Sequence, residues 1–289
     1  MEYEGRICRG PMERASYMLP VAVGCSYNAC RFCMLFKHLQ YRELPLEQIE
    51  AELQRIHALK AAPKVVYLGD GNAMHLPHER MMTILRMIET YLPNKPEVRM
   101  DATVTDILAR SDEQLQELYD HGVRRLYLGI ESGLDDVLRT MLKDHTIPQA
   151  QEAIGRIHQI GMCYGAHIMT GIAGSGRCIE NAEALAAFLN AYPPVAIVNF
   201  SLFVHRRAPM WKEVEAGSFT VADEVETMRE ERRLLELLDL PGCDYDGFHD
   251  LIEFRVRGRL PDQKEKMLQK IDAGIGEWAK KPSVYPIVP

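Results

Sequence analysis

Apolar residues along the chain follow two alternating patterns. Short runs rich in β-branched and aromatic residues predict buried strands. Between these runs, apolar residues recur every three or four positions, as they do on one face of a helix. The six predicted strands are residues 17–23, 64–68, 98–102, 126–130, 164–170 and 195–203. Strand and helix alternate six times without a long hairpin, which predicts parallel strands joined by helical crossovers.

Polar residues are expected to begin two of the helices. Ser111 is followed three residues later by Gln114, and this pair predicts a capping box. Thr220 is expected to cap a charged helix that runs to about Leu238.

The pattern changes after Pro241, where a strand over 251–256 and a charged helix over 261–278 are predicted. Six strand–helix units suit an open barrel better than a closed one of eight. The expected fold class is therefore α/β, a partial (β/α)6 barrel of parallel strands with a small C-terminal α+β cap. The expected parts are a lead-in over 1–16, the barrel over 17–240, and the cap with its tail over 241–289.

Composition limits the classes of function. Of the 289 residues, 47% are apolar, which is enough for a large core. The net charge of −7 disfavours a broad nucleic-acid surface, because such surfaces are normally basic. No apolar run is long enough to span a bilayer, and the acidic start does not resemble a signal peptide. We expect a cytoplasmic protein with no membrane partner.

Three cysteines lie close together directly after the first predicted strand. Cys25, Cys30 and Cys33 have the spacing C-x4-C-x2-C. Thiolates bind iron–sulfur clusters or zinc, so the spacing leaves both open. Zinc in a structural site takes four protein ligands, and His38 is the obvious fourth. The odd total of seven cysteines in a chain of this length argues against a disulfide framework.

This loop resembles the signature of the radical S-adenosylmethionine (radical SAM) superfamily. Its usual form is C-x3-C-x2-C with an aromatic residue before the last cysteine, which here is Phe32, and this chain has one extra residue. It is similar to a group of short members with a GCS-x-N-x-C-x-F-C loop. The resemblance extends from about Pro11 to about Asp272.

The resemblance implies an enzyme with two cofactors, one [4Fe-4S] cluster and S-adenosylmethionine. Cys25, Cys30 and Cys33 would bind three irons, and S-adenosylmethionine would bind the fourth. Reductive cleavage would give a 5′-deoxyadenosyl radical that abstracts hydrogen from a substrate. The reaction would be that of an oxidoreductase, transferase or lyase. The implied partners are an electron donor such as flavodoxin or ferredoxin and a small-molecule substrate, with nucleic acid an unlikely partner.

Loops after later strands supply the expected cosubstrate site. The superfamily binds the amino group of S-adenosylmethionine at a loop after the second strand, where this chain has Gly-Asp-Gly-Asn. A polar residue after the fourth strand is expected to contact the cosubstrate, and the fifth strand and its glycine loop are expected to pack on adenine. The residues concerned are Gly69, Asp70, Gly71, Asn72, Glu131, Met169, Gly171 and Ile172.

Polar residues at strand ends and inside strands are candidates for substrate binding. Adjacent arginines, Arg206 and Arg207, can clamp a carboxylate or phosphate. The six candidates are Asp101, His167, Asn199, Ser201, His205 and Arg206.

Other readings stay open. A zinc-binding interaction module would use the three cysteines with His38. A radical SAM enzyme could modify a peptide, a protein or RNA in place of a small molecule. A non-radical α/β barrel enzyme would carry the cysteines incidentally.

Overall fold

The computed structural model describes residues 8–289. The described residues fall into two compact units. The first contains the chain up to Asn28, Leu35–Leu128 and Glu152–Tyr164, and the second contains Ala29–Met34, Gly129–Gln151 and Gly165–Pro289. Residues 1–7 of the predicted lead-in lie outside the described residues.

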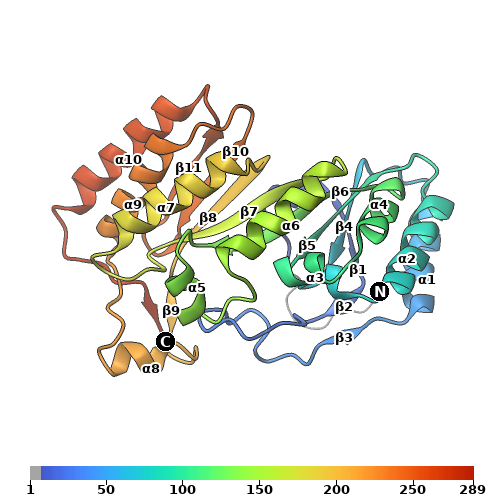
Figure 1. Cartoon of the computed structure of the whole chain (residues 1–289), viewed down its shortest axis with the longest axis horizontal. Helices are drawn as coiled ribbons and strands as arrows, with labels where there is room; N and C mark the ends of the chain where they lie inside the picture. The colour runs from blue at the N-terminus through green and yellow to red at the C-terminus, as the bar shows by residue number, and fades with distance from the viewer. Residues whose placement is uncertain (1–7) are drawn as a thin grey trace. The chain divides into compact units, whose positions relative to one another are not determined.

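In the first unit, strands β1, β4, β5 and β6 are neighbours in that order, and each neighbouring pair is parallel (Figure 1). Helices connect them, as parallel pairing requires. The strands are β1 (Tyr17–Pro20), β4 (Val65–Gly69), β5 (Glu97–Ala102) and β6 (Val123–Glu131), whose last residues belong to the second unit. The helices and 3₁₀ turns are η1 (Pro11–Glu13), α1 (Leu46–Ala58), η2 (Ala73–His75), α2 (His78–Tyr91), α3 (Val104–Leu108) and α4 (Asp112–Asp120).

The second unit has the strand order β7-β8-β10-β11, in which β10 and β11 are antiparallel and the other pairs parallel. Figure 1 shows α7, α9 and α10 side by side along these strands. The strands are β7 (Cys163–Thr170), β8 (Ala196–Ser201), β10 (Asp244–His249) and β11 (Phe254–Arg259), with the short pair β9 (Val204–His205) and β12 (Ile287–Val288). The helices and 3₁₀ turn are α5 (Asp135–Thr140), α7 (Cys178–Ala191), α8 (Trp211–Glu215), α9 (Glu224–Leu237), η3 (Asp250–Ile252) and α10 (Lys264–Trp278). Helix α6 (Ile147–Gln159) begins in the second unit and belongs to the first from Glu152, as do the first two residues of β7.

The α/β fold with parallel strands and helical crossovers is confirmed. The second to sixth predicted strands agree with β4 to β8 within three residues at either end. The first predicted strand, 17–23, is divided into β1 and the short β2 (Ala22–Val23), which pairs with β3 (Arg42–Glu43). The capping box of Ser111 and Gln114 is confirmed.

Two predictions at the C-terminal end are wrong. Thr220 does not cap the charged helix: Asp223 is its N-cap and accepts a hydrogen bond from the Glu226 backbone N–H at 2.9 Å. The strand predicted over 251–256 begins only at Phe254, and β10 before it was missed. Both strands extend the sheet of the second unit, and the division into lead-in, barrel and cap stays a prediction.

The lead-in is part of the core of the first unit. Its 3₁₀ turn η1 buries the carboxylate of Glu13 to 1% exposure. One carboxylate oxygen, Oε1, accepts hydrogen bonds from Arg99 at 3.0 Å and from the Tyr127 hydroxyl at 2.5 Å. Arg99 and Tyr127 belong to β5 and β6, so this carboxylate holds the lead-in against two strands.

A buried charge network holds the second unit together. His249, on β10, contacts the carboxylates of Glu224 at 2.9 Å and Glu231 at 3.0 Å, both on α9. All three residues are at most 1% exposed. Burial alone would lower the pKa of His249, but its hydrogen bonds to the two carboxylates outweigh that effect and raise it to about 9.

This pKa predicts a pH dependence of stability. Because the folded pKa lies above the unfolded value of about 6.5, the contribution of His249 is complete below pH 6.5 and is lost as pH rises through 9. The loss amounts to about 3 kcal/mol at 1.36 kcal/mol per unit. We expect the free energy of unfolding, measured by urea denaturation from pH 6 to 10, to fall by about that amount more in the wild type than in His249→Gln. An exposed control, His57→Gln, should keep the wild-type slope, and equal slopes for all three proteins would contradict the prediction.

Candidate functional site

In the first unit, the Gly-Asp-Gly-Asn loop touches the backbone beside Cys25. Gly71 has a φ of +55°, and a Cβ there would collide with the Gly24 carbonyl oxygen and lie 3.1 Å from the Cys25 Cα. Only glycine fits such an approach. Asn72 donates from Nδ2 to the Ser26 hydroxyl at 3.0 Å. The structure therefore brings together the first cysteine and the loop after β4.

Asp70 is buried at the same place, directly after Gly69 at the end of β4. Its Oδ1 accepts the backbone N–H groups of Gly71 at 2.9 Å and Cys8 at 3.2 Å. Burial raises the pKa of this carboxyl, and the two N–H donors oppose that rise. The carboxylate charge of Asp70 is suited to an external donor such as an ammonium group.

Asn72 also donates to a carboxylate that sequence reasoning missed, that of Asp106 on α3. Asp106 Oδ2 accepts this bond and a second one from the Thr103 hydroxyl at 2.5 Å. Asp106 Oδ1 contacts the His75 ring nitrogen Nδ1 at 2.8 Å. Asp106 thereby fixes the orientation of the Asn72 amide. No helix was predicted over residues 103–108. In the structure Thr103 is the N-cap of α3, and Asp106 lies in the first turn of that helix.

Asp101, at the end of β5, is a titratable group at neutral pH. Burial raises its pKa to about 7, the Tyr67 hydroxyl lowers it, and the nearby charges of Asp70 and Glu13 raise it. A carboxyl with this pKa can both accept and donate a proton near pH 7.

In the second unit, Cys30 and Cys33 lie near a buried ion pair. Burial raises the pKa of the Cys30 thiol to about 11, the Lys143 ammonium lowers it, and Glu131 and Cys33 raise it. Phe32, between the two thiols in sequence, packs with Ile172 in one apolar cluster. The predicted cysteine loop and the predicted adenine loop thus share a core.

Glu131 is held in an unusual conformation at the end of β6. Its φ is +62°, which is rare for a residue other than glycine and is typical of functional sites. Its carboxylate is 7% exposed and lies 3.3 Å from the ammonium of Lys143. Burial raises the pKa of Glu131, and Lys143 lowers it. Sequence reasoning missed Lys143, which lies in a short connection after α5 without any motif.

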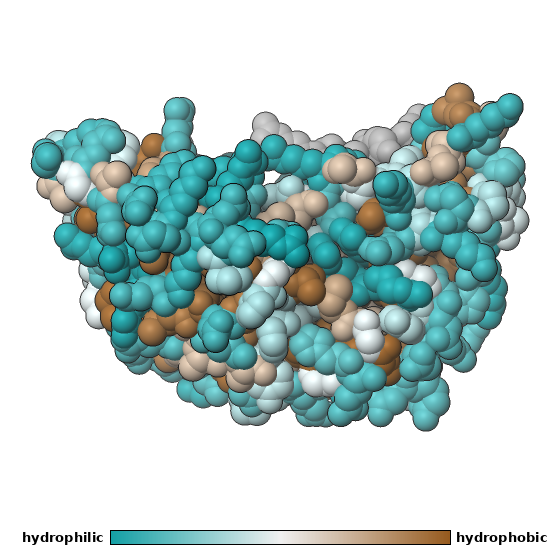
Figure 2. Space-filling view, turned by 90° about the horizontal axis from the view of Figure 1, so that it is seen from above, coloured by the Kyte–Doolittle hydropathy of each residue, from teal (hydrophilic) through white to brown (hydrophobic). Residues whose placement is uncertain are grey.

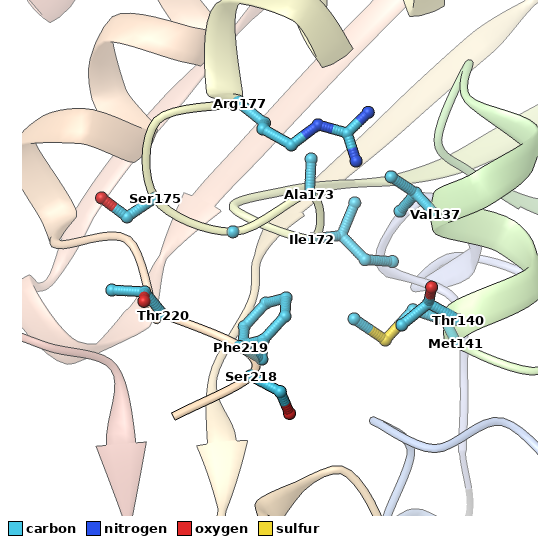
Figure 3. Close-up of a pocket in the computed structure, with 11 residues that line it drawn as sticks. Val137, Thr140, Met141, Ile172, Ala173, Ser175, Arg177, Ser218, Phe219 and Thr220 are labelled. Atoms are coloured by element: carbon cyan, nitrogen blue, oxygen red, sulfur yellow. The ribbon is translucent and has the colours of Figure 1, made fainter. Parts of the chain in front are cut away.

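A pocket of about 300 Å³ lies beside the glycine loop of the second unit (Figure 3). Ile172 and Ala173 form one wall, Met141 another, and the Phe219 ring a third. Figure 3 shows the Arg177 guanidinium above Ala173, where Asp136 accepts its Nη1–H at 2.6 Å. Of the predicted adenine residues, Ile172 lines this pocket, and Met169 packs on the apolar cluster next to it.

The polar residues inside β7 and β8 have different surroundings. Burial, together with the nearby Lys143 charge, lowers the pKa of His167 to about 4, so its ring is neutral at pH 7. The Asn199 amide accepts from the Thr170 N–H at 3.2 Å and donates to a Glu231 carboxylate, which favours a structural role. Ser201 is buried at the end of β8, at 6% exposure.

The residues after β8 do not form a single clamp. The guanidinium of Arg206 lies over the Trp211 ring, 5.1 Å from its centroid. Arg207 contacts His205 through both its backbone N–H, at 3.0 Å, and its side chain. The two arginines therefore have separate partners.

The cysteines of the described chain are candidates for binding metal. None of the cysteines among residues 8–289 forms a disulfide, and no three His, Cys, Asp or Glu side chains there already stand as a metal site. No preformed site is therefore found in the described residues, either for the three cysteines alone or for the three cysteines with His38. Cys25 in the first unit and Cys30 and Cys33 in the second are each partly buried thiols, and soft sulfur donors of this kind are the ligands that iron–sulfur clusters take. The Lys143 ammonium beside Cys30 favours the thiolate that metal binding requires.

The visible face in Figure 2 is mostly hydrophilic, with apolar residues scattered over it. Among the described helices, none has the length and apolar character needed to cross a bilayer.

Comparisons with known proteins identify the family of the chain. The sequence model described as "Radical SAM superfamily" matches residues 19–186, more than half of the chain. A curated relative is the tRNA-2-methylthio-N(6)-dimethylallyladenosine synthase of Chlorobium luteolum, 26% identical over 238 residues. The match covers 78% of this chain and 50% of the relative, so the chain spans about half the relative's length.

Solved structures show the same fold. Methylornithine synthase is 16% identical with a TM-score of 0.55, covering 79% of this chain and 65% of that one. A cobalamin-dependent S-adenosylmethionine radical enzyme, OxsB, is 16% identical with a TM-score of 0.58, covering 77% of this chain and 41% of that one. A radical S-adenosylmethionine methyltransferase from Kitasatospora setae, with cobalamin and a [4Fe-4S] cluster bound, is 15% identical with a TM-score of 0.56, covering 70% and 39%. These likenesses agree with the predicted open, partial barrel.

The close approach of Gly71 to the cysteine loop predicts the effect of one methyl group. Gly71→Ala should displace the backbone at Gly24 and Cys25 and lower the iron bound per chain after anaerobic reconstitution by at least half. The control is Gly155→Ala, since Gly155 lies in α6 with nothing within 4 Å of an added Cβ. Equal iron in Gly71→Ala and the wild type would contradict the role given to this contact.

Proposed function

We propose a reaction for this chain, which belongs to the radical SAM superfamily and is a radical SAM enzyme. The enzymes of this family use a [4Fe-4S] cluster and S-adenosylmethionine, and the cofactors expected from the sequence are confirmed. The proposed reaction begins with reductive cleavage of S-adenosylmethionine and continues with hydrogen abstraction from a substrate. The observation that carries it is the buried Glu131–Lys143 pair of the second unit, whose charges lie near enough to the Cys30 thiol to shift its pKa.

Cys25, Cys30 and Cys33 are the proposed cluster ligands. When bound, the cluster supplies the electron that cleaves S-adenosylmethionine to methionine and a 5′-deoxyadenosyl radical, which takes hydrogen from the substrate. Two local contacts of the protein position these thiols. Gly71 supports the backbone at Cys25, and Phe32 anchors the loop between Cys30 and Cys33 in the apolar cluster.

Charged groups of both signs are proposed to bind the cosubstrate. The Asp70 carboxylate, oriented by two backbone N–H groups, suits the ammonium of the methionine moiety. The buried Lys143 ammonium suits its carboxylate, and Glu131 suits the ribose hydroxyls. Gly69, Gly71 and Asn72 shape the ammonium loop.

Apolar contacts are proposed to hold the adenine. Met169 and Ile172 offer side chains of the same apolar cluster, and Gly171 lets the backbone of the loop come close to a flat ring. These contacts exclude water from the bond that breaks, which protects a reactive intermediate from side reactions.

A small-molecule substrate is proposed, since the net charge of −7 disfavours a polyanion. Asp101 is well suited to bind a substrate N–H or ammonium, because its carboxyl titrates near neutrality. His167, neutral at pH 7, can offer a hydrogen bond without adding charge. A cytoplasmic electron donor such as flavodoxin or ferredoxin would supply the electron, since the family needs a reductant.

Transfer RNA is the second candidate substrate. The observation that favours it is the curated relative, whose name states that it acts on tRNA, although this chain spans only half of it. The exposed arginines after β8 are then the candidate phosphate contacts.

Single cysteine replacements test the assignment of ligands. Changing Cys25, Cys30 or Cys33 to Ser should each lower the rate of 5′-deoxyadenosine formation in the presence of dithionite by at least a hundredfold, because each loses one iron ligand. Cys163→Ser is the matched control: Cys163 lies far from the loop in sequence and donates to the Arg124 carbonyl at 3.3 Å, which a hydroxyl can replace. A cysteine-loop variant with the wild-type rate would rule out that residue as a ligand, and loss of metal in His38→Ala would favour the zinc alternative.

Substrate class is tested by stimulation of cosubstrate cleavage. We expect a metabolite fraction below 3 kDa to raise the rate of 5′-deoxyadenosine formation by the reconstituted enzyme, and Asp101→Asn to abolish the rise while leaving basal cleavage. Purified bulk tRNA is the parallel arm. Stimulation by tRNA alone would exclude the small-molecule proposal.

A further inference from the structure

A chain of buried hydrogen bonds links two loops of the second unit through helices α7 and α9. The Ser132 hydroxyl donates to Asn181 Oδ1 at 2.5 Å, and the Asn181 amide donates to Glu230 Oε1 at 2.6 Å. The other Glu230 oxygen, Oε2, accepts the Gly171 backbone N–H at 2.7 Å. Ser132 and Asn181 are 0% exposed, and Glu230 is 1% exposed. Solvent therefore supplies none of these bonds.

Each end of the chain lies beside an expected cosubstrate contact. Ser132 directly follows Glu131, the proposed ribose residue with its unusual φ. Gly171 directly precedes Ile172, a proposed adenine residue. We propose that Asn181 and Glu230 are positioning residues that fix the distance between the ribose and adenine sides of the S-adenosylmethionine site. The inference rests on the proposed function, since that function assigns the two loops to the cosubstrate.

The packing of both loops supports the proposal independently. A Cβ on Gly133 would collide with the backbone of α7 at Leu185, so the loop after β6 lies directly on that helix. A Cβ on Gly171 would come within 2.9 Å of the Thr227 side chain on α9. Each loop thus rests, at a glycine, on one of the two helices that carry the hydrogen-bond chain. The helices are themselves packed against each other.

Asn181 and Glu230 act at a distance from the cosubstrate. Protein groups already occupy both carboxylate oxygens of Glu230 and both polar atoms of Asn181. Neither side chain is needed to hold a proton or a charge in the reaction. Their loss should therefore weaken binding of the cosubstrate more than it slows cleavage once the cosubstrate is bound.

Glu230→Gln is the primary variant. It keeps the size of the side chain, but its NH2 group must face either the Gly171 N–H or the Asn181 amide, so one bond of the chain is lost. The matched control is Glu236→Gln, on the same helix, because Glu236 is exposed and pairs only with surface arginines. Ser132→Ala is the second variant. It removes the link to Asn181 and also the bond that the Leu134 N–H donates to the Ser132 hydroxyl at 3.1 Å.

The first readout needs no cofactor. Amide hydrogen exchange of the cofactor-free protein, followed by mass spectrometry, should rise at least tenfold in a peptide covering 169–176 or in one covering 130–134 for Glu230→Gln. For Ser132→Ala it should rise in a shorter peptide covering 130–133 alone, because the Leu134 N–H loses its own acceptor in this variant and is left out of the comparison. Exchange equal to the wild type in both peptides of both variants would overturn the proposal.

The second readout separates binding from cleavage. With the reconstituted enzyme, the Kd for S-adenosylmethionine should rise about tenfold in Glu230→Gln, a change of about 1.4 kcal/mol, with kcat for cleavage within about twofold of the wild type. A fall in kcat at unchanged Kd would contradict a positioning role. Failure of the wild type itself to bind S-adenosylmethionine would refute the proposed function, while the exchange result would still decide whether the chain fixes the loops.

Discussion

Parallel pairing of strands is the constraint on which the site depends. In each unit, parallel neighbours force the chain to cross back through a helix before the next strand begins. Every loop that follows such a strand then emerges at the same edge of its unit's sheet. In the first unit, the Gly-Asp-Gly-Asn loop and Asp101 lie at the ends of β4 and β5 for this reason; in the second, Glu131 and Ile172 lie at the ends of β6 and β7. The candidate ligand-binding residues of each unit therefore lie at strand ends and in the loops that follow them.

Buried charges decide which residues can serve that chemistry. Asp70 and Glu131 are both carboxylates in places where burial raises the pKa, and each has a different compensating partner. Backbone N–H groups compensate Asp70, whereas the Lys143 ammonium compensates Glu131. By contrast, the carboxylates of Glu224 and Glu231 both contact His249, and these contacts hold α9 against β10.

The sequence predicts most of the strands because their apolar runs are short and uninterrupted. It missed β10, whose Asp246 and His249 break the apolar pattern, because their charges are paired by α9 and Arg255 only in the folded chain. The cysteine loop was predictable from spacing, and family membership is confirmed by a match over residues 19–186. Lys143, Asn181 and Glu230 belong to no local motif. Their roles depend on which side chains tertiary packing brings within hydrogen-bond distance, and spacing along the chain does not encode that.

The central claim is that the three cysteines hold a cluster with one iron open to S-adenosylmethionine. The most direct test is electron paramagnetic resonance of the anaerobically reconstituted, dithionite-reduced protein, recorded with and without S-adenosylmethionine, together with iron and sulfide analysis. The account predicts about four irons per chain, as in one [4Fe-4S] cluster, and a signal that changes when the cosubstrate is added. Zinc in place of iron, or a cluster signal that S-adenosylmethionine leaves unchanged, would contradict it.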